Sequence, residues 1–201
     1  MSATQATRSR MSAEQRREQL LDVAKEIVGA QGFQGASIEA VAKRAGITRP
    51  VVYSHFGDLR SMLEAMLDRE GARALSQLAE VIPSEVEDDP REALLGALAG
   101  YLETVRADPV TWRLVLMPPE GAPPILRERV SQGRNAVVAG LAELVGPGLA
   151  PGSGSPDPEL TARMLSAVAD EGARLVLTDP KGYPIERITD QARWLLSQLS
   201  D

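Results

Sequence analysis

Residues 37–63 read SIEAVAKRAGITRPVVYSHFGDLRSML, and this stretch contains the pattern that decides the fold of the N-terminal part of the chain. Ala42 is small enough for two helices to cross closely, and Gly46, four positions later, tolerates the positive φ that a tight turn requires. Val52 follows six residues after Gly46 and is placed to insert between the two helices. This spacing predicts a helix-turn-helix, a unit whose second helix enters the major groove of DNA.

Helical patterns continue on both sides of this stretch, and proline marks several helix starts. Asp89-Pro90, Asp108-Pro109 and Asp157-Pro158 each place a side-chain acceptor at the N-cap and proline at the first helical position, where an N–H has no partner. No segment alternates apolar and polar residues as a strand would. We therefore expect an all-α protein with helices over 13–31, 38–45, 49–55, 58–82, 90–107, 109–116, 123–145, 158–178 and 184–199.

The predicted domain organisation follows from these helices and from the loops between them. We expect a disordered arm over 1–11, a helix-turn-helix domain over 12–57 and a larger helical domain over 58–201. Capping boxes are predicted for Ser12 with Gln15 and for Asp89 with Glu92. Loops are predicted over 83–89 and 118–124, and over the Gly/Pro/Ser-rich run 146–156.

The composition excludes several classes of protein. The 201 residues include no cysteine and one histidine, His55, so disulfides, thiol catalysis and zinc–cysteine sites are ruled out, and no metal ion or other cofactor is expected. The longest apolar run, Leu94–Leu102, is too short to cross a bilayer, and residues 1–11 lack the apolar core of a secretory signal. We therefore expect a cytoplasmic protein without a membrane partner.

Charge is distributed unevenly along the chain. Residues 1–60 contain 9 Lys/Arg against 6 Asp/Glu, whereas residues 61–201 contain 13 against 22. The N-terminal part is therefore basic and the rest of the chain acidic. This distribution indicates that only the N-terminal part contacts a polyanion such as DNA. The excess of three positive charges is modest, however, and chance could also produce it.

Several short motifs accompany the helix-turn-helix spacing. They are Gly32-Phe33 after the first helix, Ser37-Ile38 before the second, Ala45-Gly46-Ile47-Thr48 at the turn, and then Tyr53, His55-Phe56 and Asp58. With these motifs, the segment from about Met11 to Leu67 resembles the tetracycline-repressor (TetR) family of bacterial transcription regulators. Beyond Leu67 the similarity is limited to length, helical character and two strong C-terminal helices.

The resemblance implies a set of DNA-contacting residues. Arg49 would contact guanine, since its fork matches O6 and N7, and Val51 could meet a thymine methyl group. Tyr53 and His55 would bind phosphates, although half-buried helix residues are the plain alternative for both. The whole predicted set is Ser37, Thr48, Arg49, Pro50, Val51, Tyr53, Ser54, His55 and Arg60.

The sequence departs from the family pattern at two positions near this surface. Glycine is more common in the family where Pro50 stands, but proline loses no hydrogen bond in a first helical turn. Lysine is common where Leu59 stands, so one phosphate contact is missing or is made by the neighbouring Arg60. Arg8 and Arg10 precede the first helix, in an arm that either reaches a minor groove or is a solvated tail.

The last two predicted helices carry apolar stripes suited to a partner helix. In the resembling family these helices pair across a dimer axis as a four-helix bundle, and the alternative is that they pack only on their own core. Dimerisation would double the phosphate contacts and match a palindromic operator. The predicted interface residues are Leu160, Met164, Val168, Gly172, Leu175, Ile185, Ile188, Ala192, Leu195 and Leu199.

In such a regulator the segment 61–145 would enclose a cavity for a small-molecule effector. The candidate lining residues are Met62, Met66, Leu98, Tyr101, Trp112, Leu116, Asn135 and Val138, although helically spaced apolar residues are also typical of plain core. Arg134, Asp170 and Glu171 could balance the charge of a ligand or pair with one another.

These observations predict a homodimeric, ligand-responsive DNA-binding regulator of the bacterial cytoplasm, namely a repressor that a small molecule releases from its operator. An enzyme is disfavoured, because the sequence has no Gly-rich phosphate loop, no HExxH, no nucleophile elbow and no catalytic residue set. A helical protein-interaction module with a degenerate helix-turn-helix is the other alternative, and the low basic charge and Leu59 keep it open.

Overall fold

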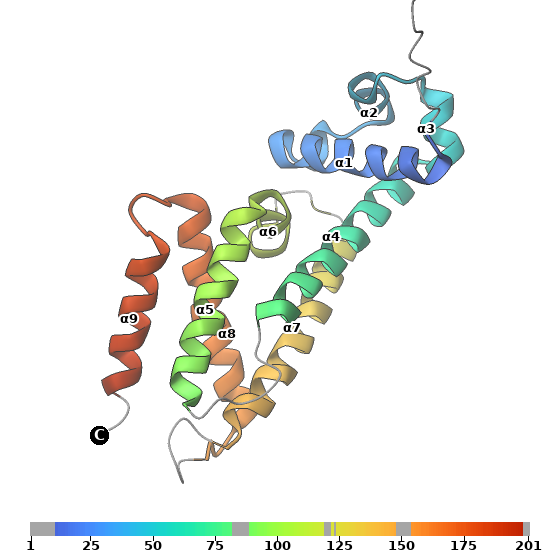
Figure 1. Cartoon of the computed structure of the whole chain (residues 1–201). Coiled ribbons are helices and arrows are strands. Elements are labelled where there is room, and N and C mark those ends of the chain that lie inside the picture. Colours follow the sequence, from blue (N-terminus) through green and yellow to red (C-terminus); the bar gives the residue numbers. More distant parts are fainter. Residues whose placement is uncertain (1–10, 82–88, 119–121, 123, 148–153, 199–201) are drawn as a thin grey trace, which may run out of the picture. The chain divides into compact units, whose positions relative to one another are not determined.

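A computed structural model describes residues 11–81, 89–118, 122, 124–147 and 154–198, and the structural statements below concern these residues (Figure 1). Within these ranges the chain is helical and contains no strand. In chain order the elements are α1 (Ala13–Gln31), the 3₁₀ turn η1 (Phe33–Gly35), α2 (Ile38–Ala45), α3 (Arg49–Phe56), α4 (Leu59–Val81), α5 (Pro90–Ala107), α6 (Pro109–Leu116), α7 (Pro124–Val145), α8 (Pro158–Thr178) and α9 (Ile185–Gln198).

The predicted all-α fold is confirmed, and the predicted helices match the observed ones to within a residue at their described ends. One such difference is at α3, which runs to Phe56 and ends where Gly57 adopts φ 76°. Among the expected N-caps, Asp89 and Asp157 accept hydrogen bonds from the N–H groups of Arg91 and Leu160. Asp108 stands at the N-cap of α6 as predicted, but its side chain makes no capping hydrogen bond, so that part of the prediction was wrong: the carboxylate lies 2.8 Å from Arg73 Nε instead.

Some predictions concern residues outside the described ranges. These are the arm with Arg8 and Arg10, most of the loops over 83–89, 118–124 and 146–156, and the interface residue Leu199. In the part of the chain that is described, none of the helices combines the length and the apolar character needed to cross a bilayer.

The chain forms two compact units, one up to Met66 and one from Leu67 onward, so α4 contributes residues to both. The division that we expected, between residues 57 and 58, remains a prediction. Each unit has its own buried core, and the two are described separately below.

The N-terminal unit is built on α1, against which α2 packs, and α3 in turn packs on α2. Ser12 and Gln15 form the predicted capping box at the start of α1. Ser37 caps α2, since its Oγ accepts a hydrogen bond from the Ala40 N–H at 3.0 Å. The core contains Leu20, Leu21, Ala24, Ile27 and Val28 of α1, Ile38, Val41 and Ala42 of α2, and Val52 and Phe56 of α3.

The turn between α2 and α3 has the geometry that the sequence pattern predicts. Gly46 adopts φ 68° and ψ 34°, a left-handed conformation that glycine tolerates best. The N–H of Ile47 then returns to the carbonyl of Ala42 at 3.0 Å and closes the end of α2. This short turn is what allows Val52 to reach the core from the following helix.

The C-terminal unit contains α5 to α9 and the second part of α4. Helix α8 contacts α5, α6 and α7, and α5 contacts α9 (Figure 1). Gly172 of α8 lies where a Cβ atom would be 3.2 Å from Cγ2 of Ile188, so glycine permits the close approach of α9. The core cluster consists of Ala74, Tyr101, Leu102, Val105, Trp112, Leu116, Ala173, Val176, Leu177 and Ile185.

Replacing Gly46 tests whether the turn conformation supports the N-terminal unit. We expect Gly46→Ala to lower the free energy of unfolding by about 1–2 kcal/mol, because a Cβ disfavours the left-handed conformation. No atom lies within 4 Å of such a Cβ, so the effect is conformational and not a clash. Chemical denaturation measures it, with Gly46→Asn as the control, since asparagine adopts this conformation more readily. Equal losses in the two variants would contradict this explanation.

Candidate nucleic-acid interface and ligand cavity

Helix α3 has an exposed face and a buried face. Val52 and Phe56 point into the core of the N-terminal unit, and Val52 is completely buried. Arg49, Pro50 and Tyr53 are exposed on the same short helix. Pro50 lies in the first turn and fits there without removing a helical hydrogen bond. The predicted base-contacting residues Thr48, Arg49, Pro50, Val51 and Ser54 are therefore all accessible to a partner.

The predicted phosphate contacts lie on neighbouring elements of the same unit. Ser37 is exposed at the start of α2. Its Oγ accepts a hydrogen bond from the Ala40 N–H, and the hydroxyl hydrogen of Ser37 can still donate to a phosphate. Tyr53 is half exposed, and His55 is partly buried with its ring centroid 6.3 Å from that of Phe56. These positions agree with a polar rim around the exposed face of α3, and phosphate binding by them remains a prediction.

Besides Ser37, two more of the predicted contacts have intramolecular partners. Ser54 Oγ donates a hydrogen bond to the Val51 carbonyl at 2.8 Å. Arg60 Nε lies 2.8 Å from Glu64 Oε1, and this hydrogen bond raises the pKa of the Arg60 guanidinium. Because the Arg60 side chain is 85% exposed, water screens this pair and a phosphate could compete for the guanidinium.

Asp58 holds the beginning of the fourth helix. Its Oδ1 accepts a hydrogen bond from the Ser61 N–H at 2.7 Å, and this contact lowers the pKa of the Asp58 carboxyl. A charged carboxylate at this end of a helix also interacts favourably with the helix dipole. Asp58 therefore stabilises the first turn of α4, from which Arg60 extends.

The predicted dimer residues fall into an exposed and a buried group. Leu160, Met164 and Val168 of α8 are 54%, 64% and 63% exposed, and Leu195 of α9 is 47% exposed. Ile185 and Gly172 are buried in the core of their own unit, and Ile188 packs against it. Leu175 and Ala192 are partly buried. Sequence reasoning missed Trp194, a 55% exposed neighbour of Leu195, because it lies off the 3–4 spacing that defined the stripe.

The C-terminal unit contains a partly open cavity of about 430 Å³. Residues of α4, α5, α6, α7 and α8 line it. The apolar part of the lining consists of Leu67, Gly71, Ala72, Ala74, Leu75, Leu78, Trp112, Leu114, Val115, Leu116, Leu126, Val130, Gly133 and Val137, and the polar part of Asp68, Glu70, Tyr101, Arg129, Gln132, Arg134, Ser166 and Asp170.

The structure brings together only part of the predicted ligand-binding set. Tyr101, Trp112 and Leu116 line the cavity. Met62 and Met66 are buried in the N-terminal unit and do not line it, because they belong to the first part of α4. Three further residues are also absent from the lining: Leu98 packs against the core cluster, Val138 is buried, and Asn135 is exposed.

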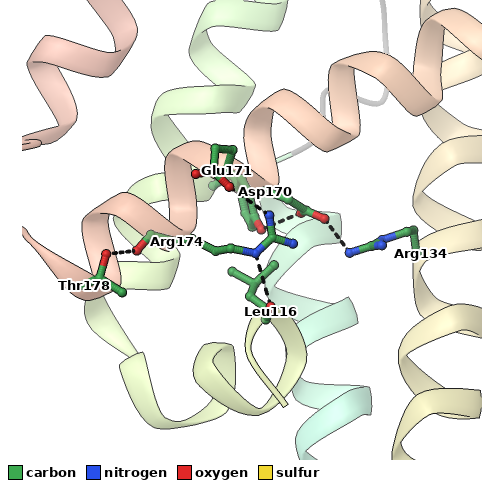
Figure 2. Close-up of polar contacts among 7 residues, drawn as sticks. Leu116, Arg134, Asp170, Glu171, Arg174 and Thr178 are labelled. Atoms are coloured by element: carbon green, nitrogen blue, oxygen red, sulfur yellow. Dashed lines mark hydrogen bonds and ion pairs between the residues drawn. The ribbon is translucent and has the colours of Figure 1, made fainter. Parts of the chain in front are cut away.

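A polar network on one wall of the cavity connects three helices. Asp170 of α8 lies 2.7 Å from Nη2 of Arg134 on α7, and Figure 2 shows the two side chains directed toward one another. The hydroxyl of Tyr101 on α5 donates to the other oxygen of Asp170 at 3.1 Å. Burial, together with the negative charge of Asp170, raises the pKa of Tyr101, so that its hydroxyl remains a donor.

Glu171 and Arg174 form a second polar group on the next part of α8. Arg174 lies 3.2 Å from Glu171 and donates from Nε to the carbonyl of Leu116, the last residue of α6 (Figure 2). Of the three residues expected to balance a ligand or one another, Glu171 therefore pairs with Arg174, whereas Arg134 and Asp170 pair together.

Glu70 is a buried carboxylate that sequence reasoning did not identify. It is 2% exposed, and Arg69 donates to its Oε1 from Nε and Nη2 at 3.0 and 2.8 Å. Thr111 Oγ1 donates to its Oε2 at 2.6 Å from the buried side of α6. The helical pattern of α4 alone does not distinguish a buried glutamate from an exposed one, since its partner Thr111 is 41 residues away.

A helix-turn-helix with an exposed second helix, followed by a helical unit with a cavity, is typical of bacterial transcription regulators. Comparison with known proteins makes the assignment specific. Residues 20–66 match the family model described as bacterial regulatory proteins, tetR family. The N-terminal part of the chain thus carries the TetR-family DNA-binding module, and the chain is similar to TetR-family transcriptional regulators.

Individual relatives agree with this assignment. The HTH-type transcriptional activator FasR of Mycolicibacterium smegmatis is 28% identical over 107 residues, which is 53% of this chain and 48% of FasR. A TetR-like transcriptional regulator from Rhodococcus sp. RHA1 has a TM-score of 0.75 at 25% identity, covering 94% of this chain and 97% of that chain.

A further solved structure shares the fold. FadR from Bacillus subtilis, a transcriptional regulator in complex with stearoyl-CoA, has a TM-score of 0.66 at 17% identity over 89% of this chain and 96% of that chain. The chain spans about half the length of the curated relatives it matches. These relatives are regulators and not enzymes.

Removing the Thr111 hydroxyl tests the buried network at Glu70. We expect Thr111→Val to lower the free energy of unfolding of the C-terminal unit by about 1.5–3 kcal/mol, because a hydrogen bond to a buried carboxylate is lost. Chemical denaturation followed by tryptophan fluorescence measures the loss. Thr178→Val is the control, since the exposed Thr178 hydroxyl bonds only to carbonyls of its own helix and its loss should change stability by under about 0.5 kcal/mol. Similar values for both variants would show that the Glu70 network contributes little.

Proposed function

We propose that this chain binds duplex DNA sequence-specifically through α3 and acts as a repressor on a palindromic operator in the bacterial cytoplasm. The observation that carries the proposal is the division of α3 into a buried anchor, Val52 and Phe56, and an exposed face. A helix held in this way keeps a fixed set of side chains outside the core, as reading base edges in the major groove requires.

The chemistry of the exposed face agrees with base readout. Arg49 carries a bidentate donor that matches guanine, and Val51 offers an apolar contact for a thymine methyl group. Tyr53, His55, Ser37 and Arg60 surround this face with groups that can donate to phosphates. Together these residues would orient α3 on the duplex and read part of one half-site.

We propose that two chains bind the operator together through α8 and α9. Leu160, Met164 and Val168 follow one another at intervals of four, so they form one apolar stripe on α8, and each is more than half exposed. Leu195 and Trp194 add exposed apolar surface on α9. A contiguous exposed stripe of this kind is typical of a protein–protein interface, and a dimer would double the phosphate contacts.

We further propose that the cavity of the C-terminal unit holds a small-molecule effector. Its volume and mostly apolar lining are typical of sites for small organic ligands. Helix α4 contributes both to the N-terminal unit and to the cavity wall, so a ligand can favour one conformation of that helix. A difference of about 2–3 kcal/mol in ligand affinity between two conformations would weaken operator binding by about 30–150-fold.

Selection of bound sequences from a random duplex pool with the purified chain tests DNA binding and symmetry together. The proposal expects a palindromic consensus with two half-sites, and retention that weakens steeply as salt increases. A protein-interaction module with a degenerate helix-turn-helix would give no consensus and no retention at low salt. A promoter–reporter assay with the selected site then distinguishes repression from activation.

Removing the Arg49 side chain tests direct readout. On the selected duplex Arg49→Ala should weaken binding by about 1–3 kcal/mol and relax preference at one base pair in each half-site. A repeat of the selection and a quantitative gel shift measure both effects.

Tyr53→Phe is the matched control for Arg49→Ala, because it removes one donor from the same helix. Loss of a phosphate contact should weaken binding to all duplexes by a similar factor and leave the consensus unchanged. An altered consensus in Tyr53→Phe, or an unaltered one in Arg49→Ala, would contradict the assigned roles.

A charge placed in the apolar stripe tests the dimer. Met164→Glu should convert the protein to a monomer at micromolar concentration, because the carboxylate would lose its water in the interface. Analytical ultracentrifugation measures the mass. Ala139→Glu adds the same charge to an exposed position of α7 and should leave the dimer intact. A wild-type chain that sediments as a monomer would overturn this part of the proposal.

A further inference from the structure

The cavity of the C-terminal unit contains charged side chains that are already paired. Among its described lining residues, Asp170 pairs with Arg134 and Asp68 with Arg129, while Glu70 pairs with Arg69. A charged ligand that enters must therefore exchange places with one member of a pair. The member of a pair that is more exposed to water is the easier one to displace. A pair with an exposed arginine and a buried carboxylate therefore favours a positively charged ligand.

The Asp170–Arg134 pair favours loss of the arginine. The Arg134 side chain is 45% exposed and the Asp170 side chain only 14%. If Arg134 moves away, water can hydrate its guanidinium at little cost. The Asp170 carboxylate is more buried, so it would lose stability without a cation beside it and favours a new cationic partner. Tyr101 also donates to Asp170 and holds the carboxylate in place on the cavity wall.

The other two pairs do not offer such an exchange. Asp68 and Arg129 are 50% and 45% exposed, so water screens both and neither depends strongly on the other. Glu70 has both carboxylate oxygens engaged, by Arg69 and by Thr111, and it is almost completely buried. Asp170 is therefore the carboxylate on this wall at which an incoming cation can replace a solvent-accessible arginine.

The surroundings of Asp170 also suit an organic cation. Tyr101, which binds Asp170, packs edge to face on Trp112 with ring centroids 5.2 Å apart, and both rings line the cavity. Aromatic rings stabilise neighbouring cations. Leucine and valine side chains such as Leu75, Leu78 and Val137 then provide an apolar wall for a hydrocarbon group.

We propose that the cavity binds an apolar organic cation, whose positive group replaces Arg134 on Asp170 and whose hydrocarbon part lies along the leucine-rich wall. This inference names the chemical class of the effector and so deepens the proposed ligand response. Binding itself depends only on the cavity and can be measured without DNA.

Calorimetric titration of the full chain near neutral pH with three probes of equal chain length tests the charge preference. Octylammonium, 1-octanol and octanoate differ mainly in their head group, so their affinities isolate its effect. We expect octylammonium to bind at least about tenfold more tightly than octanol, and octanoate to bind most weakly. Tightest binding of octanoate, or no binding of octylammonium up to about 1 mM, would overturn the proposal.

Variants of the pair give an independent test with opposite signs. Asp170→Asn keeps an acceptor for Tyr101 and should weaken octylammonium about tenfold while changing octanol less than about twofold. Arg134→Gln removes the competing cation and should strengthen octylammonium several-fold. Arg129→Gln removes another lining guanidinium as the matched control and should change octylammonium less than about twofold. If Asp170→Asn does not fold, Arg134→Gln decides, and weaker or unchanged octylammonium binding in it would contradict the exchange.

A gel shift with the selected duplex separates this inference from the proposed regulatory role. Release of the duplex by octylammonium, but not by octanoate, would support both. Octylammonium binding without any effect on the duplex would support the cation site and contradict the effector role. Release of the duplex by octanoate with no octylammonium binding would support an effector site and overturn the cation proposal.

Discussion

The burial of Val52 and Phe56 is the interaction on which the N-terminal unit depends. An eight-residue helix is too short to be stable alone, so α3 exists because these two side chains hold it against the core. The left-handed turn at Gly46 lets the chain reverse in the few residues available. The same two features leave Arg49 and its neighbours outside, so the packing that stabilises α3 also determines which residues a duplex would meet.

In the C-terminal unit, the corresponding constraint is the pairing of buried and half-buried charges around an apolar cavity. Asp170 and Glu70 are each accommodated beside an apolar cavity by a guanidinium and a hydroxyl donor. These contacts connect α4, α5, α6, α7 and α8. In the proposed ligand response, a ligand that altered the Asp170 pair would act on three of these helices, α5, α7 and α8.

The helices could be predicted closely from the sequence because local chemistry sets most of their ends. Ser12, Ser37, Asp89 and Asp157 cap the helices that they precede, and Gly57 ends α3. The exposed face of α3 could also be predicted from the sequence, because one short motif contains both the buried residues and the exposed residues of this helix. The family resemblance supplied the roles of those residues, which remain predictions.

The cavity was predicted less well, because its lining depends on contacts between distant segments. Met62 and Met66 have the same helical character as Leu75 and Leu78, and only the tertiary structure shows which part of α4 borders the cavity. The pairing of Glu70 with Thr111 was invisible for the same reason. Asp108 shows the opposite case, in which a tertiary ion pair with Arg73 overrides a local capping signal.

Hydrogen–deuterium exchange of the chain, alone and with its selected duplex, tests most directly whether an anchored α3 is the DNA-reading element. Without DNA, the backbone amides of α3 should exchange more slowly than those of an isolated short helix, and the duplex should add protection over residues 37–60 while leaving α7 unchanged. Protection by DNA elsewhere in the chain with none on α3 would contradict the account.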